Sequence, residues 1–224
     1  MPEVIFYEKT DNFDCIRAKQ EALRIIRDDL LKKKKTGVVL TGGVSDPYNP
    51  EEKEHKLTRN ALELINAFRF GICIITKSDL VKRDMDILLD IKEHSPTSVN
   101  FSITCSDDET CMKVEPFVST TTKRFEAIEH LAKNGIITGV LMDPVIPYIT
   151  DTVENIQEMV KKQSVTALNT YTFQLLLLWQ MYSATIFTTR QENIIPEFLI
   201  DIRISLKIIT VVTRPIVKNC GMRL

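Results

Sequence analysis

Short apolar segments alternate with longer amphipathic segments along the first two thirds of the chain. Four of the apolar segments are rich in β-branched residues and are predicted to be buried strands, at Gly37–Thr41, Gly71–Thr76, Ser98–Thr104 and Gly135–Met142. Each is followed by a segment in which apolar residues recur every three or four positions, the pattern of a helix with one buried face.

The helix boundaries follow from local signals. A helix over Asp14–Lys34 is predicted before the first strand, and the helix before the fourth strand is expected to stop at Gly135. The last of the series is predicted to begin at Asp151, with Glu154 completing a capping box. Its buried face is expected to comprise Val153, Ile156 and Val160.

This alternation predicts an α/β fold with parallel strands joined by right-handed crossovers. A closed eight-stranded barrel typically needs about 250 residues. With 224 residues and about four βα units, the chain is predicted to form a partial TIM-like barrel or a curved open sheet.

Charge and cysteine usage narrow the function classes. The formal net charge of −1 gives no electrostatic reason to expect nucleic acid or an anionic membrane as a partner. The basic block Lys32–Lys35 lies at a predicted helix end, where it is interpreted as solvated.

The N-terminal residues do not resemble a signal peptide, and five scattered cysteines suit a reducing cytoplasm, where we expect the protein. Their spacing gives no metal-binding signature.

Polar residues gather where the predicted strands end. The first strand runs into TGGVSDPYNP (Thr41–Pro50), and Lys77 follows the second. Carboxyl ends of parallel strands are where ligands collect in such folds. Gly42 and Gly43 would let a ligand approach the backbone closely, and Lys77 suits a carboxylate. Ser102 and Thr104 are expected to point the same way on the third strand. Each residue alone has a plain structural explanation, but together they favour a ligand site.

Two further function classes are open to this arrangement. A non-catalytic module could bind a nucleoside or a phosphorylated metabolite at the same strand ends. A hydrolytic enzyme is disfavoured, because the three histidines (His55, His94 and His130) fall in or at the ends of helices and no nucleophile, base and orienting group come together.

Several stretches resemble one known family. TGGVSDPYNPEEKEHKLTRNALELI, GICIITKSD, FSIT, VEPFVSTTTKRFEAI and GVLMDPVIPYITDT are similar to the radical S-adenosylmethionine (SAM) proteins of the spore photoproduct lyase-like group. The resemblance runs from about Asn12 to Lys162. It implies a partial barrel that holds SAM and a four-iron–four-sulfur cluster, an electron donor, and reductive cleavage of SAM to a 5′-deoxyadenosyl radical.

The resemblance also implies roles for individual residues. Gly42 and Gly43 would receive the amino group of SAM, with Ser45 and Asp46 shaping the loop. Lys77 would meet the carboxylate of SAM.

On the neighbouring strands, Ser102 and Thr104 would face the ribose, and the backbone around Asp143–Val145 would line the adenine. Arg124 matches an arginine at the start of a helix in the family. Its role is either to stabilise the fold or to lie on the substrate side of the site. Lyases of the group act on DNA photoproducts, but this sequence has no aromatic-basic pattern that supports DNA binding.

The chain departs from the family pattern at two places. The three cluster cysteines of the family, spaced C-x-x-x-C-x-x-C, should lie just upstream of Asp11, and no such motif occurs in the sequence. The cluster would therefore have no protein ligands, and we expect the chain to be an inactive fragment of the family's barrel, spanning residues 1–164.

The second departure is the C-terminal segment, residues 165–224. Only nine of the 59 charged residues fall there. Back-translated with chosen codons, Met181–Arg190 and Pro215–Leu224 both give, in the third reading frame, peptides similar to the family's C-terminal part. We therefore expect this segment to be out of frame and irregular; the alternative is a natural, divergent tail.

Overall fold

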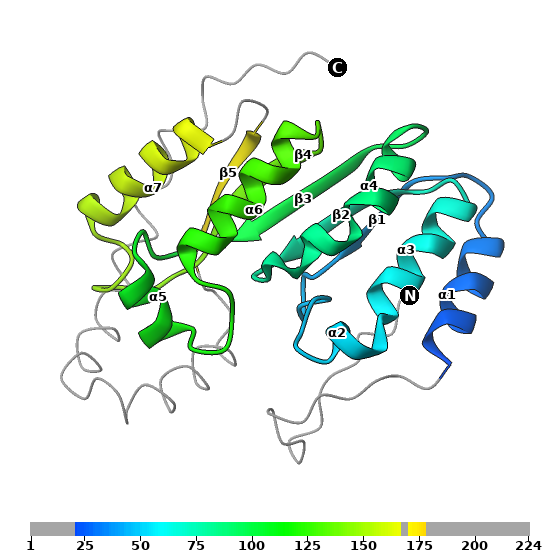
Figure 1. Ribbon diagram of the computed structural model, residues 1–224, viewed down its shortest axis with the longest axis horizontal. Coiled ribbons are helices and arrows are strands. Elements are labelled where there is room, and N and C mark those ends of the chain that lie inside the picture. The colour runs from blue at the N-terminus through cyan, green and yellow to red at the C-terminus, as the bar shows by residue number, and fades with distance from the viewer. Residues whose placement is uncertain (1–20, 167–169, 178–224) are drawn as a thin grey trace.

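The computed structural model describes residues 21–166 and 170–177, and its sheet contains five parallel strands (Figure 1). The strands follow one another in the order β1-β2-β3-β4-β5, each pairing in parallel with the next. Because consecutive strands pair in parallel, each connection between two strands crosses the same face of the sheet in the same direction. This is the arrangement in a section of a βα-barrel. The strands are β1 (Val38–Thr41), β2 (Gly71–Thr76), β3 (Thr97–Ser102), β4 (Ile137–Val145) and β5 (Thr170–Leu177).

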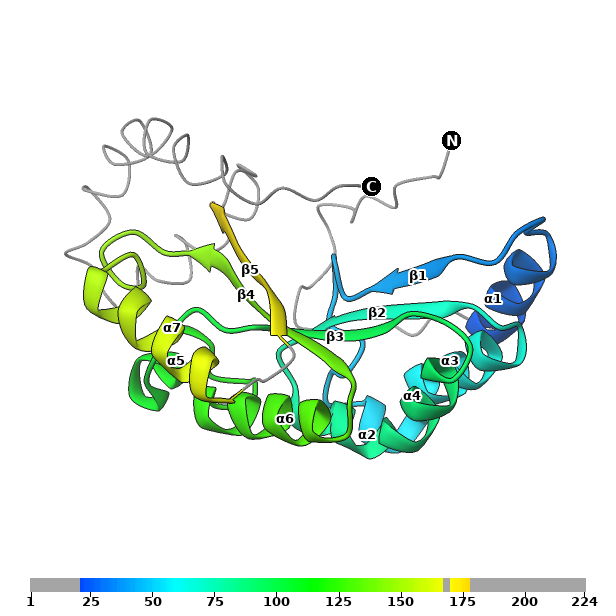
Figure 2. The same ribbon diagram turned by 90° about the horizontal axis from the view of Figure 1, so that it is seen from above.

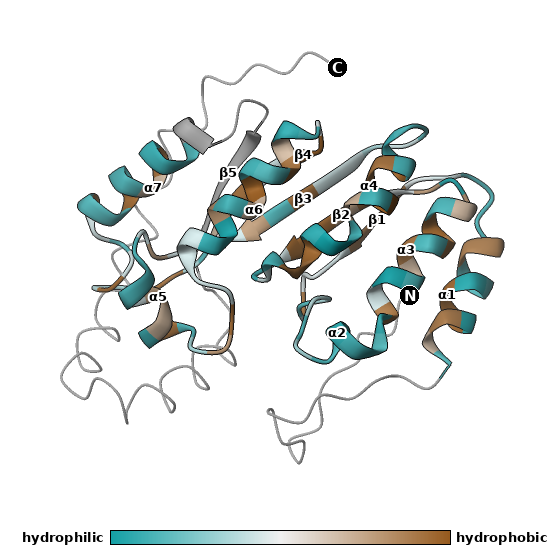
Figure 3. Cartoon of the chain, in the orientation of Figure 1, coloured by the Kyte–Doolittle hydropathy of each residue, from teal (hydrophilic) through white to brown (hydrophobic). Residues whose placement is uncertain are grey.

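The described helices gather on one face of this sheet (Figure 2). They are α1 (Ala22–Leu31), α2 (Glu52–His55), α3 (Leu57–Ala67), the 3-10 helix η1 (Asp79–Asp84), α4 (Met85–Lys92), α5 (Asp108–Val114), α6 (Thr121–Lys133) and α7 (Val153–Thr166). The helices carry both hydrophilic and hydrophobic residues, as helices that cover a sheet do (Figure 3). We call the face of the sheet away from these helices the inner face.

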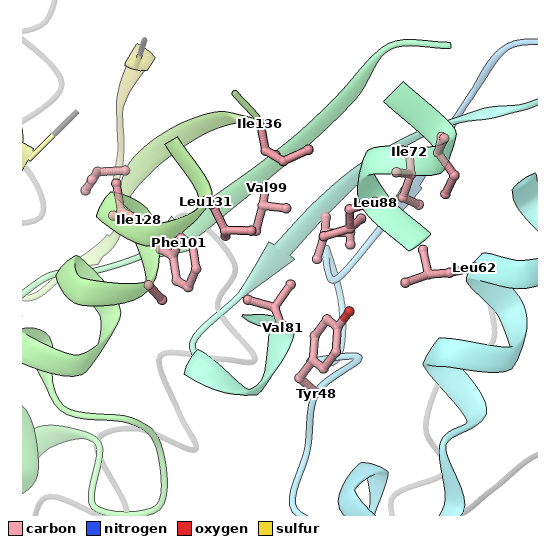
Figure 4. Packing of buried hydrophobic residues seen from close by; sticks show 14 of the residues in the cluster. Tyr48, Leu62, Ile72, Val81, Leu88, Val99, Phe101, Ile128, Leu131 and Ile136 are labelled. Carbon is pink, nitrogen blue, oxygen red and sulfur yellow. The ribbon is translucent and has the colours of Figure 1, made fainter. Parts of the chain in front are cut away.

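The core lies between the sheet and the helices (Figure 4). Val99 and Phe101 of β3 are fully buried on the side of the sheet that faces the helices. Ile72 and Ile74 of β2 are buried on the same side. Leu131 of α6 packs in the same cluster. Because side chains alternate between the faces of a strand, the intervening residues of β2 and β3 lie on the inner face.

The α/β architecture with a parallel, unclosed sheet agrees with the sequence prediction. β2 has the predicted bounds, whereas β3 ends at Ser102 rather than Thr104, and β4 is shifted to Ile137–Val145. Within the described residues, β1 and β5 each pair with one strand only.

Two predictions for the C-terminal third need correction. Residues 170–177 form β5 beside β4, so an irregular chain is the wrong description of this stretch; residues 178–224 lie outside the described part. Helix α7 begins at Val153 and is capped by the hydroxyl of Thr152, which accepts a hydrogen bond from the Asn155 amide (3.2 Å).

The predicted buried face of α7 is also wrong in part. Val153 and Val160 are exposed, and Met159 is fully buried instead. The carboxylate of Asp151, expected to cap the helix, accepts a hydrogen bond from the Tyr148 amide (2.6 Å). The N-cap of the helix is therefore Thr152, one residue after the Asp151 that the capping-box signal indicated.

None of the helices in the described residues is long and apolar enough to cross a membrane. The predicted helix over Asp14–Lys34 is present as α1 from Ala22 to Leu31, and residues 14–20 lie outside the described part. The division of the chain at residue 164 remains a prediction.

Candidate functional site

The ends of β2, β3 and β4 place three polar side chains on the inner face. In β2, Ile74 and Thr76 are buried on the helix side, so alternation puts Lys77 on the inner face just past the strand. Thr76 pairs with Phe101, which brings Lys77 level with Ser102 of β3. Ser102 pairs with Leu141, and Asp143 lies two residues further along the same face of β4. We call Lys77, Ser102 and Asp143 the rim row.

The stretch Thr41–Pro50, called here the corner, turns at two glycines with different roles. Gly42 has φ of +91°, and a Cβ built there would lie 1.8 Å from the carbonyl oxygen of Ile75. Only glycine allows this close approach of the corner to β2. Gly43 has open space around its Cα and is exposed, so its backbone is accessible to a ligand. Ser45 is also exposed.

Asp46 fastens the corner to the end of β2. Its Oδ1 accepts hydrogen bonds from the Thr76 hydroxyl (2.7 Å) and from the Tyr48 amide (2.9 Å). Its Oδ2 accepts from the Lys77 amide (2.6 Å). The carboxylate thus holds the corner against the backbone of Lys77, which fixes Gly43 beside the rim row.

A buried ionic network lies beneath the corner. Asp84, fully buried at the end of η1, accepts hydrogen bonds from the Tyr48 hydroxyl (3.1 Å), from Arg59 Nη1 (3.1 Å) and from Arg83 Nε (2.9 Å). Arg83 Nη2 also donates to buried Glu52 (2.7 Å). Burial and the neighbouring Asp84 carboxylate raise the pKa of Tyr48 well above its ordinary value. Tyr48 itself packs within the hydrophobic cluster (Figure 4).

Lys77 does not stand alone on the rim. Its Nζ donates to Glu115 Oε1 (2.5 Å), and Arg124 Nη2 donates to the other oxygen of Glu115 (2.8 Å). Burial by itself would raise the pKa of Glu115, but the positive charges of Lys77 and Arg124 outweigh it and lower that pKa. Glu115 is therefore an ionised carboxylate shared by two cations, one buried and one partly exposed.

Arg124, at the start of α6, has a structural role. It is fully buried, and its guanidinium donates to the carbonyl of Ser102 (2.6 Å) and to the carbonyl of Ser119 (2.7 Å). With Glu115 it ties the end of β3 to the chain that leads into α6.

Ser102 and Thr104 are not equivalent. Ser102 is the last residue of β3 and lies on the inner face with 8% of its surface exposed. Thr104 lies beyond the strand, is 2% exposed, and its hydroxyl is 3.6 Å from the Cys105 sulfur. The period-two argument from sequence therefore applies to Ser102 and ends before Thr104. The carbonyl of Thr104 accepts a hydrogen bond from Asn155 Nδ2 (2.8 Å).

Asp143 completes the rim row on β4. Its side chain is half-buried, and burial raises its pKa, while the nearby charge of Lys77 acts in the opposite direction. The strand register places the end of β3 between Lys77 and Asp143.

The sequence predicted that the corner, Lys77 and Ser102 lie at strand ends, as they do in the structure, and it named the backbone around Asp143 as a lining for adenine; that these residues bind a ligand stays a prediction. Sequence reasoning missed the partners Glu115 and Asp84, because a carboxylate in a loop or on a short helix gives no periodic signal. The signal available in the sequence was that the VEP stretch, which contains Glu115, lies shortly before the predicted helix that carries Arg124.

Comparisons with known proteins bear on this site. A sequence model of the radical SAM superfamily matches residues 14–162. An uncharacterized protein of Methanocaldococcus jannaschii is 40% identical over 124 residues, which cover 55% of this chain and 46% of that protein. An uncharacterized protein of Mycobacterium tuberculosis is 24% identical over 159 residues, covering 70% of this chain and 47% of that protein. The chain thus spans about half the length of these relatives.

Two solved structures have a similar fold. Both are variants of spore photoproduct lyase, with TM-scores of 0.55 and 0.54 and 19% sequence identity. Each comparison covers 75% of this chain and 49% of the lyase. One of these variants was solved with bound SAM and a dinucleoside spore photoproduct.

The described residues do not fit an iron–sulfur cluster. Cys105 and Cys111 are buried, and burial raises the pKa of Cys105 to about 11, which disfavours the thiolate that a cluster requires. Cys73 lies on β2, where its sulfur accepts from Asn100 Nδ2 (3.4 Å). Among the described residues, no three His, Cys, Asp or Glu side chains are placed to hold a metal ion.

The inner face carries side chains of the chemical types that SAM would need. The rim row offers a cation for a carboxylate, a hydroxyl for a ribose and a carboxylate for a positive charge. The exposed backbone of Gly43 lies beside it.

Proposed function

Because this chain belongs to the radical SAM superfamily, we propose that its rim row and corner bind SAM. The observation that carries the proposal is the placement of Lys77 and Ser102 level with each other on the inner face, beside the accessible backbone of Gly43. These groups match the carboxylate, the ribose and the amino group of one ligand molecule.

Each residue has a distinct part in this binding. The corner carbonyls at Gly42 and Gly43 accept hydrogen bonds from the amino group, while Ser45 and Asp46 set the shape of the corner. Lys77 pairs with the carboxylate of SAM. Glu115 accepts a hydrogen bond from the Lys77 ammonium and so holds it in position for this contact.

The nucleoside end of SAM lies over β3 and β4. The ribose contacts the hydroxyl of Ser102 rather than that of Thr104, which is 2% exposed. The adenine lies along the backbone of Asp143–Val145.

We further propose that the parent enzyme is a member of the spore photoproduct lyase-like group. In that group SAM is cleaved reductively with an electron delivered through a cluster held by three cysteines. The 224 residues contain no C-x-x-x-C-x-x-C motif, so we expect them to bind SAM without cleaving it.

A second candidate is a non-catalytic module that binds nucleosides or phosphates. The missing cysteine motif favours it, but a phosphate carries more negative charge than the single carboxylate of SAM, and Lys77, shared with Glu115, is the one cation of the rim row.

Titration calorimetry and anaerobic iron–sulfide treatment of the full chain test these proposals. We expect saturable SAM binding, no binding of inorganic phosphate, no broad charge-transfer absorption and no cleavage of SAM under reducing conditions. Phosphate binding without SAM binding would establish the second candidate. An absorption band together with SAM cleavage would contradict the expected inactivity.

A further inference from the structure

Asp143 is a rim carboxylate for which the described part of the chain supplies no hydrogen-bond donor. Val140 and Met142 of β4 are fully buried against the helices, so alternation places Asp143 on the inner face. Its side chain is half-buried there. The other carboxylates near the corner and rim, Asp46, Asp84 and Glu115, each accept two or more hydrogen bonds.

A partly buried carboxylate without donors is costly unless a positive charge lies near it. The cation that acts on the pKa of Asp143 is Lys77, and the Lys77 ammonium already donates a hydrogen bond to Glu115. Among the described residues, Asp143 thus faces the inner side of the sheet without a cation paired to it.

The charges of the rim row alternate across the sheet. Lys77 on β2 is positive, Ser102 on β3 is neutral, and Asp143 on β4 is negative. A ligand that matches this order has an anionic group over β2 and a positive charge towards β3 and β4.

SAM, laid across the strands as proposed above, has this arrangement. Its amino group lies at the corner after β1, its carboxylate at Lys77 and its ribose at Ser102. The sulfonium connects the methionine part to the ribose and therefore lies on the Asp143 side of Lys77, whereas the amino group lies on the opposite side.

We infer that Asp143 recognises the sulfonium charge of SAM and makes the site prefer SAM to S-adenosylhomocysteine, its neutral thioether counterpart. This inference rests on the proposed function. Asp143 acts here as a specificity-determining residue, through charge attraction across the rim, and needs no direct hydrogen bond.

Calorimetry of the full chain with both compounds tests the inference. The wild type should bind SAM about tenfold more tightly than S-adenosylhomocysteine, as expected for one charge pair at a partly buried site. Asp143→Asn should weaken SAM binding by about tenfold and change S-adenosylhomocysteine binding by less than about twofold. Asp143→Glu, which keeps the charge, should preserve the preference.

Asp90→Asn is the matched control, because Asp90 is exposed on α4 and the same chemical change there should alter neither affinity. If Asp143→Asn does not fold, the salt dependence of the wild type decides: added salt should weaken SAM binding more than S-adenosylhomocysteine binding. Equal losses for both ligands in Asp143→Asn, or equal salt dependence, would overturn the inference. Failure of the wild type to bind SAM would instead contradict the proposed function.

Discussion

At the scale of single residues, the largely buried carboxylates Asp84 and Glu115 are both paired with cations, and these pairs hold the rim in shape. Beneath the corner, Asp84 accepts hydrogen bonds from two arginines and a tyrosine. At the rim, Glu115 accepts hydrogen bonds from Arg124 and Lys77. Removing one member of a buried pair costs far more than the pair contributes, because the other charge is left without compensation. Glu115 is therefore the residue whose loss should disturb the rim most.

Glu115→Gln should lower the free energy of unfolding by about 3 kcal/mol at pH 7, because buried Arg124 loses its counter-charge. The pKa of Glu115 lies below its usual 4.5 in the folded protein, so its ionised form stabilises the fold above that pH. The contribution is lost as pH falls through the folded-state pKa. Urea unfolding of both proteins from pH 7 to pH 3 should show the difference shrinking below pH 4.5.

The control for this measurement is Glu109→Gln. Glu109 pairs with Lys113 on the exposed side of α5, where a solvated ion pair contributes little to stability. A Glu115→Gln protein as stable as the control at pH 7 would show that the rim does not depend on this carboxylate.

At the scale of elements, the corner is positioned by one close backbone contact and one carboxylate. Gly42 touches β2 through the carbonyl of Ile75, and Asp46 bonds to the backbone amide of Lys77 and to the Thr76 hydroxyl. These contacts join the corner to the end of β2, and a ligand that bridges the two needs this fixed spacing.

The two adjacent glycines provide a matched pair of variants. Gly42→Ala should destabilise the protein by at least about 2 kcal/mol, because its Cβ overlaps the Ile75 carbonyl and its φ is positive. Gly43→Ala has open space and should change stability by less than about 1 kcal/mol. Thermal unfolding of the two variants beside the wild type measures both; equal losses would show that the corner does not pack on β2 as described.

Sequence periodicity predicted the elements better than the contacts between them. The four strands were found because buried parallel strands are continuous apolar runs, and the bounds of β2 were predicted without error. The start of α7 was missed, because Asp151 and Thr152 both suit an N-cap and only the fold selects Thr152. Glu115 and Arg124 lie close in the sequence, yet their joint contact with Lys77 depends on how β2 and α6 come together.

At the scale of the whole molecule, the sheet is a section of a barrel whose inner face is free of the described helices (Figure 2). The corner and the rim row lie at one end of this face, at the carboxyl ends of β1 to β4. Ligand sites of βα folds form at this end, because loops from several strands meet there. The proposed site therefore lies where βα folds bind ligands, and binding of one SAM molecule by all four strand ends is the central claim.

Calorimetric titration of Lys77→Met with SAM and with adenosine tests that claim most directly. Lys113→Met, which removes an exposed lysine of α5, serves as the control. We expect Lys77→Met to bind SAM at least about tenfold more weakly than the wild type while its affinity for adenosine is unchanged, and Lys113→Met to match the wild type with both ligands. Undiminished SAM binding by Lys77→Met would contradict the account.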